Sequence, residues 1–357
     1  MRGTSFHCAF FPNDRTVARD SVVDEGRTVT YHRNRRRHDE ENNRAREVRN
    51  APALRGRSNP ALVVTELAAF VHVFSLAQLA NALALASLLT LLATGLALVF
   101  GLRDVMNFAH GAIFMLGAYL GYSVSGLFSF WAALVIVPVL LGLLGIVFEL
   151  GAIRPLRDRS QIDVALLTFG LALIINQVII KTWGTSPLAL SAPPSLAGAS
   201  DLFGEPYPTY RLFLIVVGFG ACLALAIWLR FSRLGMHVRA VSRSPQIARI
   251  LGVDTDRLGL LVVSLGLAYA GFAGVLAGPY LSIDPALGAN ILISCLIVVV
   301  VGGLGSIGGA IAAAVAYGLI EVFGSLVSPV LAVTAPYLLL VFILLWRPQG
   351  FGNGRID

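Results

Sequence analysis

The sequence predicts an all-α fold, a polytopic membrane bundle of about eight or nine transmembrane helices. Of the 357 residues, 56% are hydrophobic and 13% are charged, which leaves too little polar surface to cover a water-soluble globule. Nearly uncharged runs of about 18 residues or more recur from Leu76 onward, and each is long enough to cross the roughly 30 Å hydrocarbon core as a helix. The runs lack the roughly ten-residue alternation of a transmembrane β-barrel, which indicates helices.

Residues 1–60 form a different region, an arginine-rich extension. They hold 13 arginines against 8 acidic residues, and thus carry +5 of the net charge of +7. With mixed charge, few aliphatic residues and no apolar period, this region cannot bury enough surface to fold, so we expect it to be disordered. Nucleic-acid binding by Arg35, Arg36 and Arg37 is not expected, because no aromatic-bearing fold surrounds them. We favour a mis-called start codon, with translation beginning near residues 62–64.

The membrane domain is predicted over residues 61–352, followed by a short tail at 353–357. Polar or glycine-rich loops separate its apolar runs. The glycine-rich sequence GGLGSIGGA at 302–310 fits either a loop between two spans or one broken helix, so the count is eight or nine. In chain order, the expected spans are 76–100, 109–126, 130–150, 163–181, 211–229, 258–281, 289–305, 309–326 and 330–346.

The distribution of arginine predicts the orientation of these spans. The loops RPLRDRSQ (154–161) and 230–257 carry most of the arginine of the membrane domain, whereas the proline-rich loop 184–208 carries none. Positively charged loops stay on the cytoplasmic side, so we expect the first two inside and the third outside. This assignment places residues 101–108 inside and the start of the first span outside.

The cytoplasmic loop 230–257 is predicted to contain a short helix with defined ends. Ser244 is a good N-cap, Pro245 suits the first helical position, and Gly252 is a typical C-terminal stop, so about two turns of helix lie between them. The spacing of three apolar residues gives this helix an apolar face. Those residues are Ile247, Ile250 and Leu251, with Arg243 and Arg249 on the charged side.

Two interpretations of the loop helix remain open from the residues alone. It either rests on lipid headgroups as an interfacial helix or docks on another protein. The firm caps favour docking, because a docking element must keep its shape.

Two other segments combine glycine with polar side chains. In GLRDVMNFAHGA (101–112), Asn107 and His110 either shape an inner gate or satisfy nearby backbone groups with no solute contact. In GGLGSIGGA, Gly303, Gly305 and Ser306 either line a solute path at a helix break or allow close helix packing. Glu321 is the one acid expected well inside an apolar span, where it bonds an adjacent hydroxyl, faces a subunit interface or contacts the solute.

The residues argue against a metal centre, a bound cofactor and an ATP site. The cysteines Cys8, Cys222 and Cys295 lie far apart, so neither a disulfide framework nor a thiolate metal site is indicated. A P-loop needs a lysine on the phosphates, yet the only lysine, Lys181, ends a membrane span. No paired aspartates and no serine–histidine dyad lie within the spans, so we expect a transport subunit and not an enzyme.

Several motifs, in the expected order over residues 76–352, resemble those of branched-chain amino acid ABC transporter permeases. The segment RAVSRSPQIARILGVDTDRL (239–258) resembles their coupling loop, and VMNFAHGAIFMLGAY (105–119) resembles the motif of the shorter of their two paired permeases. The segments 154–177, 298–321 and WRPQGFG (346–352) fit as well. The chain departs from the family at Ala112, where many relatives are acidic, at Gly308, where proline is common, and in its arginine-rich extension.

This resemblance implies a transmembrane subunit of an ATP-driven importer in a bacterial inner membrane, acting by alternating access. Its implied partners are a second permease, two cytoplasmic ATP-binding subunits and an extracytoplasmic solute-binding protein, and its implied solutes are branched-chain or related amino acids, short amides or urea. The expected ATPase-coupling residues are Arg239, Ala240, Ser244, Pro245, Ala248, Arg249, Leu251 and Gly252. The expected translocation-path residues are Asn107, Phe108, His110, Gly111, Gly303, Gly305 and Ser306.

An ion-coupled secondary transporter of a small solute is the alternative, because broken helices and scattered polar groups suit such carriers too. The loop helix separates the two interpretations, since a carrier without ATPase subunits has no use for a capped helix in a 28-residue basic loop (230–257).

Overall fold

The computed structural model describes residues 76–103, 105–156, 159–202 and 205–352 of the chain. These residues all belong to one compact unit, Glu66–Asp357. The predictions for residues 1–60 and 353–357 therefore fall outside the described residues.

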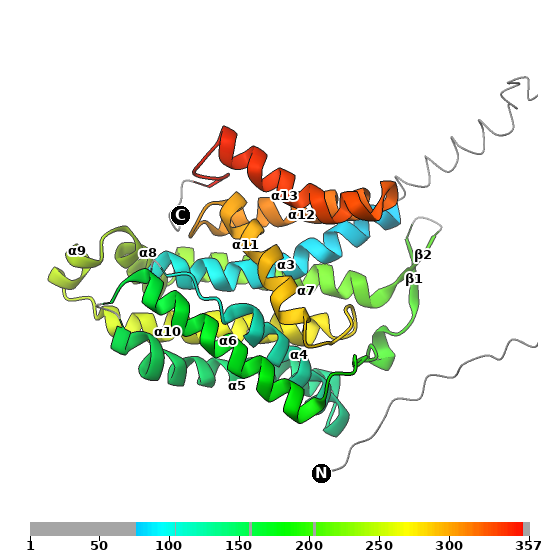
Figure 1. Cartoon of the computed structure of the whole chain (residues 1–357), viewed down its shortest axis with the longest axis horizontal. Helices are drawn as coiled ribbons and strands as arrows, with labels where there is room; N and C mark the ends of the chain where they lie inside the picture. Colours follow the sequence, from blue (N-terminus) through cyan, green and yellow to red (C-terminus); the bar gives the residue numbers. More distant parts are fainter. Residues whose placement is uncertain (1–75, 104, 157–158, 203–204, 353–357) are drawn as a thin grey trace, which may run out of the picture. The chain divides into compact units, whose positions relative to one another are not determined.

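The described residues fold almost entirely into helices, which confirms the all-α prediction (Figure 1). A π-helical turn (Glu149–Ile153) and a 3-10 turn (Arg154–Leu156) extend α5, and the strands β1 (Ala199–Leu202) and β2 (Glu205–Pro208) form a small antiparallel hairpin. The α-helices are α3 (Leu76–Arg103), α4 (His110–Leu127), α5 (Phe130–Phe148), α6 (Gln161–Trp183), α7 (Thr209–Phe231), α8 (Arg233–Arg243), α9 (Pro245–Ile250), α10 (Thr255–Ala277), α11 (Leu287–Gly302), α12 (Ile307–Val327) and α13 (Pro329–Trp346).

Within the described residues, seven helices are long and apolar enough to cross a membrane: α3, α5 with its extension, α6, α7, α10, α12 and α13. The chain is thus a multi-pass membrane protein with the helical bundle that its hydrophobic runs predict. Helix α11 is apolar but only 16 residues long, and α4 is 18 residues long and begins with a histidine. These two helices occupy the remaining two expected spans.

Helix α3 lies at the centre of the bundle, and 89% of its most hydrophobic window is buried. It packs against α7, α10 and α12. Small residues set these contacts, because they let two helix backbones approach closely. At the crossing with α10, a side-chain carbon added to Gly95 would lie 2.9 Å from the carbonyl oxygen of Gly266. At the crossing with α7, one added to Gly218 would lie 2.9 Å from Ser87.

The loops gather at two ends of the bundle. Figure 1 shows α8 and α9 at one end and the β1–β2 hairpin at the other. The arginine-bearing connections lie together at the α8–α9 end, since Arg103 after α3 pairs with Glu149 and Arg154 after α5 lies 3.5 Å from Asp256 in α10. At the opposite end, the proline-rich loop pairs with the α10–α11 loop through a backbone bridge between Leu188 and Ile283. The arginine-bearing loops and the proline-rich loop thus lie at opposite ends of the bundle, as the orientation predicted from the distribution of arginine requires.

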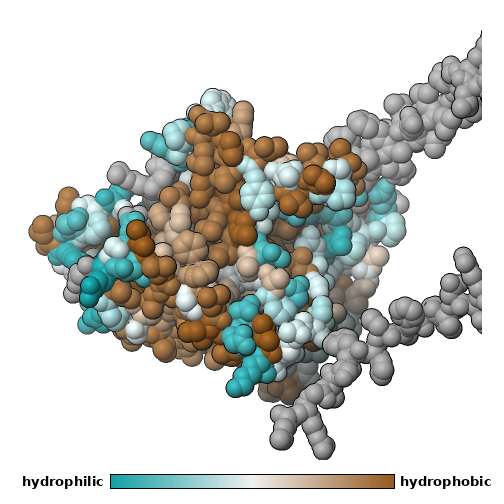
Figure 2. Space-filling model, viewed as in Figure 1, coloured by the Kyte–Doolittle hydropathy of each residue, from teal (hydrophilic) through white to brown (hydrophobic). Residues whose placement is uncertain are grey.

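Large apolar side chains cover much of the outside of the bundle. Figure 2 shows a mostly hydrophobic surface, with hydrophilic atoms gathered toward the two ends of the bundle. Helices α6 and α13 contribute strongly to it, because only 17% and 11% of their most hydrophobic windows are buried. In a membrane, such faces contact lipid or another membrane subunit.

Candidate functional site

The loop between α7 and α10 contains two helices where the sequence predicted one. Ser232 caps the first helix, α8, with its hydroxyl accepting a hydrogen bond from the Gly235 amide at 2.9 Å. Ser244 ends α8 and caps the second helix, α9, by accepting from the Ile247 amide at 3.4 Å, with Pro245 at the first helical position. The structure therefore confirms the capped helix expected at α9, and it adds α8, which the sequence analysis missed.

Helix α9 has one inward side chain and three outward ones. Ala248 is 2% exposed, whereas Ile247, Ile250 and Leu251 are 59%, 83% and 76% exposed. The apolar face expected from the spacing thus projects from the bundle, and Ala248 anchors the helix. Ala248 packs in a cluster of buried residues that joins α3, α7, α8, α10 and α12: Leu98, Leu102, Leu225, Leu229, Val238, Val241, Leu258, Val262 and Ile307.

The end of α9 is fixed by its backbone. Gly252 has a φ of +85°, a left-handed conformation that favours glycine. Its amide donates to the carbonyl oxygen of Arg249, and the amide of Val253 donates to that of Ala248, both at 3.0 Å. Only the four residues 251–254 separate the end of α9 from the start of α10. The connection between the two helices is therefore short.

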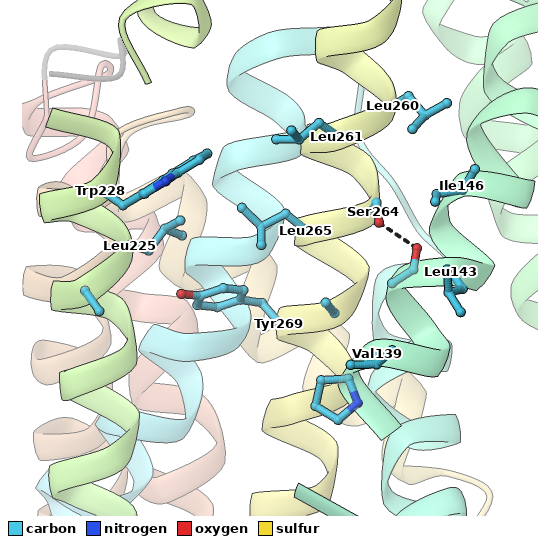
Figure 3. Close-up of a pocket in the computed structure, with 14 residues that line it drawn as sticks. Val139, Leu143, Ile146, Leu225, Trp228, Leu260, Leu261, Ser264, Leu265 and Tyr269 are labelled. Atoms are coloured by element: carbon cyan, nitrogen blue, oxygen red, sulfur yellow. Dashed lines mark hydrogen bonds between the residues drawn. The ribbon is translucent and has the colours of Figure 1, made fainter. Parts of the chain in front are cut away.

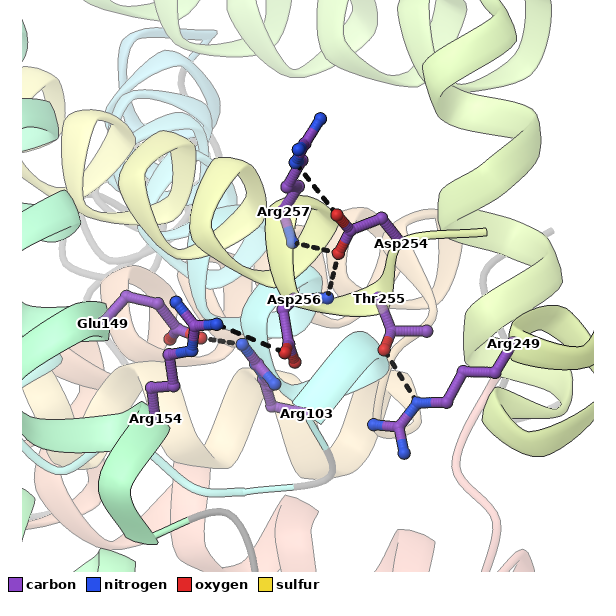
Figure 4. A network of polar contacts seen from close by, with 8 residues as sticks. All are labelled: Arg103, Glu149, Arg154, Arg249, Asp254, Thr255, Asp256 and Arg257. Carbon is purple, nitrogen blue, oxygen red and sulfur yellow. Dashed lines mark hydrogen bonds and ion pairs between the residues drawn. The ribbon is translucent and has the colours of Figure 1, made fainter. Parts of the chain in front are cut away.

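Side-chain contacts connect α9 to the start of α10 (Figure 4). The Arg249 guanidinium donates from Nε to the Thr255 hydroxyl at 2.9 Å. Asp254 caps α10 by accepting from the amides of Asp256 and Arg257 at 3.1 and 3.0 Å. These amide hydrogen bonds, the one from Arg257 above all, hold the pKa of Asp254 below its ordinary value.

The network continues from α10 toward α5 and α3 (Figure 4). Arg154 lies 3.5 Å from Asp256, and Arg103 at the end of α3 pairs with Glu149, which is 1% exposed. Glu149 also starts the π-helical turn of α5, and such turns are frequent at functional sites. Sequence analysis did not single out Glu149, although an acid and an arginine at the same end of two expected spans were a signal for this pair.

Two other predicted coupling residues lie on α8. Arg239 donates from its guanidinium to the carbonyl oxygen of Leu229, at the end of α7. Ala240 is exposed. Helix α8 is thus tied to α7 through Arg239 and leaves Ala240 accessible.

The break between α3 and α4 holds four predicted path residues. Asn107 is 2% exposed and His110 is fully buried. The Asn107 side-chain oxygen accepts from the Ala109 amide at 3.0 Å, and His110 Nε2 donates to the Leu92 carbonyl at 3.1 Å. The Phe108 amide donates to the Thr168 hydroxyl at 3.1 Å, and Gly111 packs against the backbone of Gly288. In these contacts Asn107 and His110 form hydrogen bonds with backbone groups, which is one of the two interpretations that the sequence left open.

Not every polar atom at this break is satisfied. Asn107 Nδ2 and His110 Nδ1 are buried without a hydrogen-bond partner among the described residues. Buried polar atoms of this kind require a partner such as water or solute. The contacts therefore permit a path role alongside the structural one.

The second break separates α11 from α12, and both helices are complete. Gly303 and Gly305 have φ values of +94° and +84°, and the Ser306 hydroxyl caps α12 by accepting from the Gly309 amide at 3.1 Å. The three predicted path residues thus form a tight turn. Of the two readings of the glycine-rich sequence, the loop between two helices is confirmed.

The C-terminal segment covers this turn. The amides of Phe351 and Gly352 donate to the carbonyl oxygens of Val301 and Gly302, both at 2.9 Å. We call residues 347–352 the C-terminal strap. It packs directly on Gly303, because a side-chain carbon there would lie 2.9 Å from the Gln349 and Gly352 carbonyl oxygens.

An apolar groove of about 770 Å³ lies between α5, α7 and α10 (Figure 3). Its wall includes Val139, Leu143, Trp228 and Leu265, and no predicted path residue belongs to it. Its two hydroxyl groups are already bonded, Ser264 to the Gly142 carbonyl at 2.6 Å and Tyr269 to the Ala221 carbonyl at 3.1 Å. The groove therefore offers hydrocarbon surface and no free polar group from these two residues.

The part of the chain that the structure describes contains no cluster of side chains suited to bind a metal ion. No group of three or more His, Cys, Asp or Glu side chains gathers there. Cys222 and Cys295, the two cysteines within this part, are buried in different helices.

Comparisons with known proteins agree with this architecture. A family model described as "Branched-chain amino acid transport system / permease component" matches residues 78–345. The chain is 30% identical over 295 residues to the high-affinity branched-chain amino acid transport system permease protein LivH of Salmonella typhimurium, covering 78% of this chain and 95% of that protein. The permease protein BraD of Pseudomonas aeruginosa is 28% identical over 293 residues, which cover 77% of this chain and 94% of BraD. The permease protein LivM of Escherichia coli is 27% identical over 290 residues, which cover 73% of this chain and 66% of LivM.

Proposed function

This chain belongs to the family of branched-chain amino acid transport system permease components, and we propose that it is the transmembrane permease subunit of an ATP-driven importer. Its solutes are branched-chain or related amino acids, and it resides in the cytoplasmic membrane. Two cytoplasmic ATP-binding subunits drive it, and an extracytoplasmic binding protein delivers the solute.

One observation supports this proposal above the others, namely the geometry of α9. The helix is capped at both ends, anchored by the buried Ala248, and exposes Ile247, Ile250 and Leu251 at the end of the bundle that arginine assigns to the cytoplasm. A rigid projection with an apolar outer face is suited to docking in a groove of a partner protein. Its cytoplasmic position fits an ATPase subunit as that partner.

The polar network provides a route from α9 into the bundle. A push on α9 acts on α10 through the Arg249–Thr255 hydrogen bond and the short connection at Gly252. From α10 the ion pairs of Arg154 and Arg103 reach the ends of α5 and α3. These contacts make α9 and the three helix ends a connected unit, which alternating access requires of a coupling element.

A second permease is the third kind of partner. The similar proteins LivH and LivM are two different permease proteins of transport systems with the same description. This chain resembles both, at 30% and 27% identity. The exposed apolar face of α13 provides surface for a membrane partner.

The two helix breaks are proposed as parts of the inner gate. Both lie at the α8–α9 end of the bundle, and both replace helix backbone by a turn. The unsatisfied Asn107 Nδ2 and His110 Nδ1 atoms support a wet environment at the first break. At the second break, the C-terminal strap closes over Gly303 and has to move if this turn lines an open path.

Reconstitution of the complete transporter tests the proposal. Vesicles that hold both permeases and the ATPase subunits are supplied with loaded binding protein, and ATP-dependent leucine uptake is measured. Ile250→Asp should abolish ATPase docking and uptake, because it places a charge at an 83% exposed apolar position, whereas the control Ile250→Leu should keep both. Uptake by this chain alone, driven by an ion gradient, would instead establish a secondary carrier.

A further inference from the structure

Four polar residues of α11 and α12 form a stripe that runs from the surface of the bundle inward. On α11, Asn290 is exposed and Ser294 is half-buried one turn later. On α12, the buried Tyr317 and the half-buried Glu321 have the same four-residue spacing, which stacks side chains on one helix face. The Ser294 and Tyr317 hydroxyls are hydrogen bonded at 2.8 Å, so the two pairs lie side by side. We call these four residues the α11–α12 polar face.

Glu321 is the charged member of this face. It lies six residues before the end of α12 at Val327, about 9 Å from that end, and so well within the membrane span. It is half-buried. A carboxylate directed at lipid is costly, and acids in membrane spans face a water-filled cavity or a partner.

Glu321 lies one turn after Tyr317 on the same face of α12. The Tyr317 hydroxyl is in turn hydrogen bonded to Ser294 of α11. Tyr337 of the neighbouring α13 is 46% exposed. Among the described residues, Glu321 forms no ion pair with an arginine or lysine.

One arginine at this end of the bundle is already engaged. Arg211 donates to the Asn81 side-chain oxygen at 2.6 Å, and its guanidinium carbon lies 5.6 Å from the centre of the Tyr280 ring. Glu321 therefore presents an anionic group that forms no ion pair with a cation among the described residues. A carboxylate at such a position can receive an ammonium group through a charge-assisted hydrogen bond.

We propose that the α11–α12 polar face is a wall of the solute path and that Glu321 receives the ammonium group of the transported amino acid. This inference rests on the proposed function and deepens it. The site lies in the half of the membrane away from the two helix breaks, and the second permease closes it from the open side. Figure 2 shows hydrophilic atoms within the hydrophobic surface over the region where α11 to α13 lie in Figure 1.

The first test is leucine uptake by the complete reconstituted transporter. Glu321→Gln should lower uptake about tenfold or more, because it removes a charge-assisted hydrogen bond. Stimulation of ATP hydrolysis by loaded binding protein and co-purification of the second permease should both persist. The control is Ser325→Ala on the next turn, whose exposed hydroxyl bonds only the Val322 carbonyl in α12, and uptake should be unchanged.

Two results of this test would overturn the inference. Uptake by Glu321→Gln within twofold of wild type would show that the ammonium group does not need the carboxylate. Loss of the second permease from the purified complex would show that Glu321 pairs with that subunit instead.

The second test measures water access with Glu321→Cys and a membrane-impermeant thiol reagent. The introduced thiol should react in the assembled complex. Leu338→Cys on α13, which is 63% exposed on the bundle surface, serves as the lipid-facing control and should stay unreactive. If both thiols are equally unreactive, the face is not wet and the inference fails. If the wild-type complex imports no leucine, the proposed function fails separately, and thiol reactivity still decides whether the face is wet.

Discussion

Arg249, on the outward helix α9, donates a 2.9 Å hydrogen bond to the hydroxyl of Thr255, the first residue of the membrane-crossing helix α10. This contact bypasses the turn at Gly252 and ties the proposed coupling helix to a helix that packs on α3, α4 and α5. A force applied to α9 thus acts on the centre of the bundle through a side chain as well as through the backbone.

Loss of this hydrogen bond should weaken coupling. Thr255→Val removes the acceptor and keeps the shape, so we expect leucine uptake per ATP hydrolysed to fall about two- to tenfold, the effect of losing one hydrogen bond worth about 0.5–1.5 kcal/mol. Thr255→Ser keeps the hydroxyl and is the control. An unchanged ratio of uptake to hydrolysis in Thr255→Val would remove this contact from the transmission route.

The anchor of α9 should be sensitive to charge. Ala248→Asp buries a carboxylate in an apolar cluster, which costs several kcal/mol without a partner, and should detach α9 while the protein still inserts. Hydrogen exchange of the α9 amides should therefore accelerate. Gln246→Asp places the same charge at an exposed position of the same helix, and equal acceleration in both variants would contradict the anchoring role.

The turn after α9 should tolerate only residues that accept a positive φ. Gly252 has a φ of +85° and open space around it, so Gly252→Val should cost roughly 1–2 kcal/mol through backbone strain alone. Uptake should fall while insertion is intact. Gly252→Asn should be milder, since asparagine visits this region, and equal uptake by the two variants would show that the conformation is unimportant.

Release of the C-terminal strap should expose the turn between α11 and α12. Gly350 has a φ of +74°, and a side-chain carbon there would lie 2.7 Å from the Val301 carbonyl oxygen. Gly350→Val should therefore raise hydrogen exchange at residues 303–306 severalfold. Gly308→Ala is the matched control, since nothing lies within 4 Å of its added carbon, and similar exchange in both would show that the strap does not protect the turn.

The start of α10 should respond to acid through Asp254. Its pKa is lowered by hydrogen bonds from the Arg257 and Asp256 amides, so the cap is complete above the ordinary aspartate pKa of about 3.9 and is lost as pH falls through the lowered value. Exchange protection of those amides should fall in that window. Asp254→Asn should show no such pH dependence, and an identical profile would assign the transition to another group.

Much of the fold could be predicted from the sequence, because hydrophobic length and helix caps are local properties. The runs beginning at Leu76 became helices close to their expected bounds, and Ser244 and Gly252 mark the ends of α9 where their chemistry placed them. The family resemblance, read from motifs such as VMNFAHGAIFMLGAY, is confirmed by the match over residues 78–345. Helix α8 was missed, although Ser232 is a good N-cap and the buried Val238 and Val241 recur at helical spacing on one face of it.

The sequence by itself determined that this is a helical membrane protein, which end of each span carries arginine, and where helices start and stop, since these follow from the composition and caps of short segments. Only the tertiary structure decided that Glu149 pairs with Arg103, that the C-terminal strap covers Gly303, and that Glu321 and Tyr317 lie beside Ser294. Those pairings join residues distant in the chain. They depend on which helix faces pack together, and the pattern of a single apolar segment does not contain that information.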